Sequence, residues 1–174
     1  METPQVLFVS DFVAEHGALM ATLMDTVAWD ERMKARKTAC FGVPYNYSDM
    51  VYPACPMPPA LAALLPGLNE RIGFEPNSAL LNLYPDGQAR MGFHSDRLDG
   101  LEPGTGVAIV SLGAARQLIY QRKGNKRLTH AFELNPGSLL YMDDGVQEMW
   151  KHGVPSAPEI DQPRISCTFR RLVV

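Results

Sequence analysis

The second half of the chain is a succession of short strand-like runs separated by turns, and this pattern constrains the fold more than any other feature. The turns are PDG at 85–87, KGNK at 123–126 and NPG at 135–137, in which Pro, Gly and Asn favour tight bends. The runs beside them are SALLNLY, GVAIVSLG, RQLIYQRK, LTHAFEL, GSLLYM and RISCTFRRLVV. Several short strands at regular spacing are typical of a sandwich or barrel. We therefore expect residues 78–174 to form a jelly-roll core.

Helical periodicity is confined to residues 1–77. Residues 14–28 carry apolar side chains at helical spacing, and leucines repeat at three and four across 60–71, where Pro66 is expected to weaken or kink a second helix. Helices at one end of such a chain pack on the outside of the sheets. The expected class is α+β: a double-stranded β-helix (jelly roll) with N-terminal supporting helices, in a single domain of residues 1–174.

Residues 40–59 have a different character from the segments around them. They contain five prolines and four aromatic rings without clear periodicity. Such a stretch indicates a long surface loop or an irregular hairpin, and long ordered loops are often functional.

Composition limits the function classes. The hydrophobic content of 46% with 20% charged residues is that of a soluble globular protein, and a formal net charge of -3 argues against a strongly basic nucleic-acid binder. The three cysteines have no CxxC spacing, which argues against a disulfide framework or a zinc finger and fits a reducing compartment. We find no signal peptide and no run of about 18 apolar residues. A cytoplasmic monomer without a membrane segment is expected.

A pattern of metal-binding residues follows the PDG turn. His94 and Asp96 are one residue apart, so in an extended segment both project from the same face and can reach one ion. His152 is far enough along the chain to return on an opposing strand. Two histidines and one carboxylate suit non-haem Fe(II), leaving positions open for a cosubstrate and oxygen. A His-x-Asp pair also occurs by chance, so this pattern needs support from elsewhere in the chain.

The support is PRISCTFRR near the C-terminus. In a strand, Arg164 and Arg170 share one face with Ser166 and Thr168, while Ile165, Cys167 and Phe169 face the other way. Arginines on an inner face need carboxylate partners, which a dicarboxylate cosubstrate beside iron would provide. The alternative is an exposed face with solvated arginines.

Taken together, these residues resemble the AlkB-like Fe(II)- and 2-oxoglutarate-dependent dioxygenases. The resemblance covers roughly the C-terminal hundred residues, in the order and approximate spacing of the family. The matching elements are NLYPDG at 82–87, HSD at 94–96, VAIVSLG at 107–113, NPGSLLYM at 135–142, HGVP at 152–155 and RISCTFR at 164–170.

The resemblance implies that His94, Asp96 and His152 ligate Fe(II) and are the catalytic residues. It also implies 2-oxoglutarate as cosubstrate and O2 as oxidant. Enzymes of this kind couple the conversion of 2-oxoglutarate to succinate and CO2 with hydroxylation of a C–H bond. When that carbon is an N-methyl group, the product breaks down to formaldehyde and the free amine.

The same resemblance implies a set of cosubstrate contacts. Arg164 would pair with the distal carboxylate of 2-oxoglutarate and Arg170 would lie near its iron-bound end. Asn82 and Tyr84 would contact it from the neighbouring strand, and Ser166 lies between the two arginines on their face. The PDG turn would bring this strand and the iron-binding segment together.

The substrates implied by the resemblance are N-alkylated bases in DNA or RNA, flipped out and held between aromatic rings. The loop with Tyr45, Tyr47 and Tyr52 takes the place of the substrate lid. We assign Tyr45, Tyr47, Arg97 and Trp150 as substrate contacts. The rings fit equally well with simple packing of the loop onto the core.

One departure from the family pattern keeps other substrates open. Nucleic-acid demethylases of this family carry an acidic residue two positions after the iron-binding Asp, whereas this chain has Leu98 there and Asp99 one step later. The basic clusters at 32–37 and 122–127 could hold phosphates or be ordinary solvated surface. The leading hypothesis is a demethylase of alkylated nucleic acid. The alternatives are the same chemistry on a protein or small molecule, and a non-catalytic metal-binding interaction domain.

Overall fold

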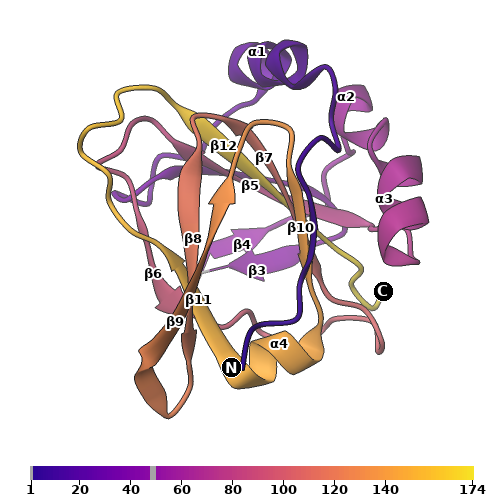
Figure 1. Ribbon diagram of the computed structural model, residues 1–174. Coiled ribbons are helices and arrows are strands. Elements are labelled where there is room, and N and C mark those ends of the chain that lie inside the picture. The colour runs from indigo at the N-terminus through magenta and orange to yellow at the C-terminus, as the bar shows by residue number, and fades with distance from the viewer. Residues whose placement is uncertain (1, 48–49) are drawn as a thin grey trace.

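Two antiparallel β-sheets face each other in the computed structural model, which describes residues 2–47 and 50–174 (Figure 1). The larger sheet has six strands in the order β1-β10-β7-β12-β5-β2. These strands are β1 (Leu7–Val9), β10 (Leu139–Met142), β7 (Val107–Gly113), β12 (Arg164–Arg170), β5 (Ser78–Tyr84) and β2 (Lys37–Gly42).

The smaller sheet has four strands in the order β6-β11-β8-β9, and a short hairpin forms a separate ladder. The four strands are β6 (Met91–His94), β11 (Trp150–Val154), β8 (Arg116–Arg122) and β9 (Asn125–Leu134); the hairpin is β3 (Tyr45–Tyr47) and β4 (Met50–Tyr52). The fold is the expected jelly roll, with antiparallel sheets and few helices.

Three helices cover the outer face of the larger sheet, and a fourth lies at the opposite end of the molecule (Figure 1). The three are α1 (His16–Thr26), α2 (Pro59–Ala62) and α3 (Leu65–Ile72); the fourth is α4 (Asp144–Met149). The apolar side chains of α1, α2 and α3, such as Leu23, Leu61 and Leu68, pack into one core cluster with the outer face of the larger sheet. The expectation of N-terminal supporting helices is confirmed.

Alternation along the central strands divides the interior into two cores. In β7, Ala108 and Val110 belong to the cluster under the helices, whereas Val107 and Ile109 belong to the cluster between the two sheets. All seven residues of the central strand β12 are buried, because one of its faces packs under the helices and the other faces the space between the sheets. The functional pocket described below is part of the space between the sheets.

The structure differs from the sequence-based expectations at the N-terminal half. The second helix is divided into α2 and α3, and Pro66 lies in the first turn of α3, where proline costs no hydrogen bond. Residues 40–59 do form an irregular hairpin, but residues 40–42 belong to β2, a strand that the sequence analysis missed. Both β1 and β2 come from the first 77 residues and complete the larger sheet at its two edges.

Candidate active site

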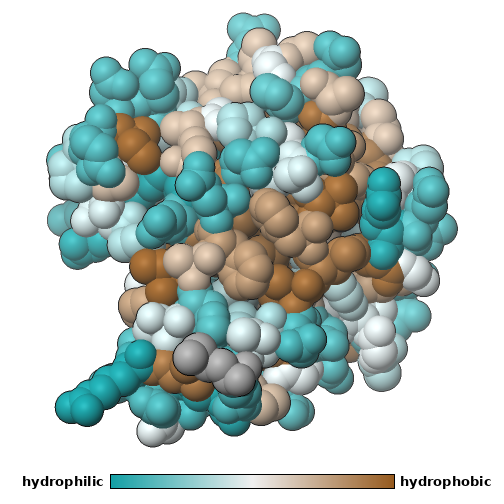
Figure 2. Space-filling model, viewed as in Figure 1, coloured by the Kyte–Doolittle hydropathy of each residue, from teal (hydrophilic) through white to brown (hydrophobic). Residues whose placement is uncertain are grey.

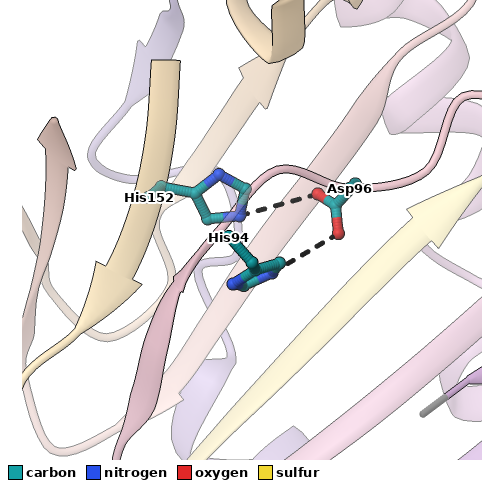
Figure 3. A group of neighbouring side chains, drawn as sticks. All are labelled: His94, Asp96 and His152. Carbon is teal, nitrogen blue, oxygen red and sulfur yellow. Dashed lines mark ion pairs between the residues drawn. The ribbon is translucent and has the colours of Figure 1, made fainter. Parts of the chain in front are cut away.

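Three side chains able to bind a metal ion converge between β6 and β11. His94 ends β6, Asp96 follows two residues later, and His152 lies on β11 directly opposite His94 in the antiparallel register. The two imidazole rings are therefore neighbours, with centroids 4.5 Å apart. The ligand atoms of the three residues all lie within 4.8 Å of one another (Figure 3). This is a two-histidine, one-carboxylate set of the kind that suits non-haem Fe(II).

The two imidazoles face the carboxylate of Asp96 through their Nε2 atoms. Nε2 of His94 lies 3.7 Å from Oδ1 of Asp96, and Nε2 of His152 lies 3.6 Å from Oδ2 (Figure 3). These separations are too long for good hydrogen bonds. Nδ1 of His94 donates to the backbone oxygen of Gly92 at 2.9 Å, since a carbonyl can only accept, and this fixes the tautomer that leaves Nε2 as a ligand.

The electrostatics of His152 and Asp96 favour metal binding near neutral pH. Burial lowers the pKa of His152 to about 4, with Asp96 opposing the shift, so this imidazole is neutral and its lone pair is available. Burial alone would raise the pKa of Asp96, but the charge of Arg170 and the two histidines outweigh it and hold that pKa well below its usual range. The carboxylate is therefore ionised.

Arg164 is buried at the base of the pocket with part of its guanidinium unpaired. Its Nη2 donates to Oγ of Ser111 at 3.0 Å, and its Cζ lies 5.1 Å from the ring centroid of Tyr84. Among the described residues, Nε and Nη1 of Arg164 have no hydrogen-bond partner. Leaving a buried charge in this state is costly. The arrangement fits a site for an anionic ligand.

Arg170 is also buried, six residues along the same strand. Its Nη2 donates to Oδ1 of Asp96 at 3.1 Å, and its Cζ lies 5.0 Å from the ring centroid of Tyr45. Within residues 2–47 and 50–174, its Nε and Nη1 find no partner. Two buried guanidiniums thus share a pocket whose described lining contributes one carboxylate, that of Asp96. A bound dicarboxylate would supply the missing negative charge.

The residues assigned to the cosubstrate lie together in this partly open pocket. Antiparallel register places Asn82 opposite Ser166 and Tyr84 opposite Arg164, and all four side chains line the cavity together with Arg170. The alternate residues of β12, Ile165, Cys167 and Phe169, pack into the core under the helices. The predicted division of β12 into a polar inner face and an apolar outer face is confirmed.

Comparison with known proteins identifies the family. The family model described as 2OG-Fe(II) oxygenase superfamily matches residues 15–170. The chain belongs to this superfamily. Fe(II), 2-oxoglutarate and O2 are the reactants that the family uses, and the converging His-Asp-His set and the unpaired buried arginines of this oxygenase fit them.

The relatives of this chain include AlkB homologues, as the sequence resemblance predicted. DNA oxidative demethylase ALKBH2 of Mus musculus is 32% identical over 148 residues, covering 79% of this chain and 62% of that protein. Alpha-ketoglutarate-dependent dioxygenase alkB homolog 3 of Homo sapiens is 30% identical, covering 91% and 62%. The uncharacterized protein R406 of Acanthamoeba polyphaga mimivirus is 31% identical, covering 94% and 85%. The chain thus spans less than two thirds of the length of the ALKBH2 and alkB homolog 3 relatives.

A solved structure supports the fold alone. The structure of OsALKBH1 superimposes with a TM-score of 0.66 at 16% identity, covering 98% of this chain and all of that one. Within the described residues, no helix of this oxygenase has the length and apolarity to cross a bilayer.

The four residues assigned to the substrate are less closely grouped than the metal and cosubstrate residues. Tyr45 packs on Arg170 but is not among the described residues that line the pocket, and Arg97 is exposed and lies 3.4 Å from Asp99 in an ion pair. Trp150 is 2% exposed and packs between the sheets, so the structure does not bring it to the pocket lining. The side chain of Tyr47 lies outside the described part of the chain.

Tyr52 and Leu98, which the sequence analysis also named, occupy packed positions. The hydroxyl of Tyr52 lies 2.5 Å from Oγ1 of Thr38, inside the small cluster below the hairpin. Leu98 packs against the core between the sheets. For Tyr52, the structure supports the interpretation that the ring packs the loop onto the core.

Two residues that contact the site were not predicted from the sequence. Arg36, which it placed only in a basic cluster, donates from Nε to Oδ1 of Asn82 at 2.8 Å. Gln147, on the unpredicted helix α4, is hydrogen-bonded to Asp96. Their partners are 46 and 51 positions away in sequence, and no local pattern signals contacts at such distances.

Proposed function

We propose that this chain oxidatively demethylates N-alkylated bases in nucleic acid, using Fe(II), 2-oxoglutarate and O2. The observation that carries the proposal is the convergence of the His94–Asp96–His152 set with two incompletely paired buried arginines in one pocket. The choice of substrate is supported by the relatives named DNA oxidative demethylase, which are about 30% identical to this chain.

Five polar side chains of the pocket have a part in this proposal. His94, Asp96 and His152 would hold Fe(II), and Arg164 would bind the distal carboxylate of 2-oxoglutarate through its unpaired nitrogens. Arg170 holds the Asp96 carboxylate and has two more donors for the other end of the cosubstrate. The bound iron and cosubstrate would supply the O2-dependent hydroxylation of an N-methyl carbon, with release of succinate, CO2 and formaldehyde.

The surface around the pocket offers contacts for a nucleic acid. Tyr45 presents an aromatic ring, held by Arg170, on which a flipped base could stack. The tip of the β8–β9 hairpin carries exposed Lys123, Lys126 and Arg127 and forms a hydrophilic projection at the lower left of Figure 2. Such cations favour phosphates even when the net charge is -3.

A protein or small-molecule substrate is the second candidate, favoured by Leu98. This side chain packs against the core where nucleic-acid demethylases of the family carry an acidic residue. The pocket therefore lacks, at that position, a carboxylate that could accept from the amino group of a base. We further propose that residues 1–174 act as one catalytic domain and as a monomer. The three cysteines are free, which fits a reducing compartment.

The test measures succinate and formaldehyde from iron-loaded protein with single-stranded DNA containing one N-methylated adenine or cytosine. An unmethylated oligonucleotide and the Asp96→Ala variant are the controls. Release of both products only with the methylated strand would support the demethylase. Succinate without formaldehyde would favour the second candidate, and the absence of both products would contradict the demethylase proposal for this chain.

A further inference from the structure

Gln147 is a buried amide that contacts the carboxylate of Asp96 and its backbone at the same time. Its Nε2 donates to Oδ2 of Asp96 at 2.9 Å, and its Oε1 accepts from the backbone N–H of Asp96, also at 2.9 Å. The side chain is 2% exposed. A buried amide with both ends satisfied by one residue acts as a clamp on that residue.

The orientation of the Gln147 amide follows from its partners. A backbone N–H can only donate, and an ionised carboxylate can only accept, so the oxygen of Gln147 must face the backbone of Asp96 and the nitrogen its carboxylate. One hydrogen bond holds the backbone N–H of Asp96 and the other holds its carboxylate. The side-chain torsions between these two points are therefore restricted to one conformation.

The clamp leaves the metal-facing side of the carboxylate open. Oδ2 of Asp96 accepts from Gln147 and Oδ1 accepts from Arg170 at 3.1 Å. Each oxygen thus has one hydrogen-bond donor, and Nε2 of His152 and Nε2 of His94 lie 3.6 and 3.7 Å from the carboxylate. A carboxylate oxygen has two lone pairs, so one remains on each for a metal ion.

Helix α4 fixes the position of Gln147. Its N-cap is Asp143, whose Oδ1 accepts from the backbone N–H of Val146 at 3.0 Å. The backbone oxygen of Gln147 accepts from Nζ of Lys123 at 2.7 Å, and Ser95 Oγ donates to the backbone oxygen of Trp150 at 2.8 Å. The helix is therefore tied both to the β8–β9 hairpin and to the segment that carries Asp96.

We propose that Gln147 is a positioning residue for the metal site, which holds the Asp96 carboxylate in the conformation that faces His94 and His152. The proposal rests on the proposed function in that the three residues bind Fe(II). It adds a residue outside the ligand set on which metal affinity depends. Outer contacts of this type change metal affinity by about 10- to 100-fold when they are removed.

The experiment compares Gln147→Met, which keeps the side-chain length and removes both hydrogen bonds, with Gln162→Met, the same change at an exposed loop position. Mn(II) binding to the ligand-free protein is measured by electron paramagnetic resonance, and folding is checked by thermal denaturation. We expect a dissociation constant for Mn(II) about 10- to 100-fold higher in Gln147→Met, a broadened spectrum of bound Mn(II), and no change in Gln162→Met.

A purely structural role of Gln147 predicts a loss of stability without a loss of metal affinity. Gln147→Met would then lower the melting temperature, while the folded protein would bind Mn(II) with an affinity within threefold of the wild type, and the proposal would be wrong. If Gln147→Met does not fold, Gln147→Asn decides in the same way, because its shorter amide cannot reach both partners. Failure of the wild-type protein to bind Mn(II) would instead overturn the metal site itself.

Discussion

Replacing Arg164 with methionine should separate the affinity for 2-oxoglutarate from the stability of the fold. The guanidinium is buried, with one nitrogen on Ser111 and two nitrogens without partners in the described part of the chain. Burial lowers the pKa of Arg164, although the nearby Tyr84 opposes the shift. The fold therefore gains little from this charge, whereas an anionic ligand would gain much.

The magnitudes follow from these contacts. Removing one member of a buried charged pair costs about 2–5 kcal/mol, so the dissociation constant for 2-oxoglutarate should rise by about 30- to 5,000-fold. Exchanging a poorly paired buried ion for an apolar side chain is neutral or stabilises by about 1–4 kcal/mol. The lost bond to Ser111 and the lost stacking on Tyr84 offset this by about 1–3 kcal/mol. The ligand-free variant should therefore keep its unfolding free energy to within about 3 kcal/mol.

The assay titrates 2-oxoglutarate into Mn(II)-loaded protein by calorimetry and unfolds the ligand-free protein in urea. Arg127→Met is the matched control, since it makes the same change on the exposed β8–β9 hairpin. Binding of 2-oxoglutarate by Arg164→Met within threefold of the wild type would refute the assignment of Arg164 as an anchor. Loss of folding in Arg164→Met would show that its internal contacts matter more than its unpaired nitrogens.

Four further predictions test the site and the fold. Asp96→Ala should abolish succinate release, because it removes the carboxylate of the ligand set. Arg116→Met should cost about 2–4 kcal/mol in urea denaturation, because its guanidinium donates to three backbone carbonyls that would lose their donor. Gly87→Ala should cost about 1–3 kcal/mol, because a Cβ there would lie 1.7 Å from a backbone oxygen, whereas Gly17→Ala meets open space in α1 and should be neutral or stabilising by up to about 1 kcal/mol. Burial raises the pKa of the Cys167 thiol to about 12, above its unfolded value, so the folded state keeps a proton that the unfolded chain releases. The unfolding free energy should fall as pH rises from about 8.5, by up to about 1.4 kcal/mol per unit, and Cys167→Ala should remove that part of the slope.

The sequence predicted those parts of the fold in which burial produces a local pattern of apolar and polar side chains. The runs at 78–84, 107–113 and 164–170 became the three central strands of the larger sheet. In β12 the alternation also predicted which side chains face the pocket, because successive residues of a strand project from opposite faces. The proximity of His94 and Asp96 was predictable for a similar reason, since they lie within three residues, whereas His152 reaches them through the pairing of β11 with β6.

The missed elements are short or lie at sheet edges. β2 is an edge strand that, among the described strands, pairs only with β5. Its last residues belong to the Pro- and aromatic-rich segment 40–59, so the turn residues of that segment hid the strand pattern. Helix α4 has six residues, too few for a periodic signal. Its one local mark is Asp143, an N-cap residue three positions before Val146. The role of Gln147 could not follow from either, because it depends on a contact across 51 positions.

Three of the buried arginines differ in how completely the protein itself pairs their guanidinium groups. Arg116 donates to the backbone oxygens of three residues around the PDG turn and the loop after β11. Arg170 has a carboxylate partner in Asp96, whereas among the described residues the hydrogen-bond partner of the Arg164 guanidinium is the hydroxyl of Ser111. The ring of Tyr84 lies between Arg116 and Arg164, with the two Cζ atoms 5.5 and 5.1 Å from its centroid.

These contacts indicate that Arg116 helps to fix the position of the Arg164 guanidinium through the ring of Tyr84. Arg116 is fixed by the backbone, so it can hold Tyr84, and Tyr84 in turn limits where the guanidinium of Arg164 can lie. A ligand that then binds Arg164 meets a donor that is already oriented and loses less entropy on binding. An arginine that is fully paired within the protein contributes to the free energy of unfolding. One that is incompletely paired contributes more to the affinity for a ligand. Substitutions at Arg116 and Arg164 should therefore have opposite profiles, the first reducing stability and the second reducing affinity.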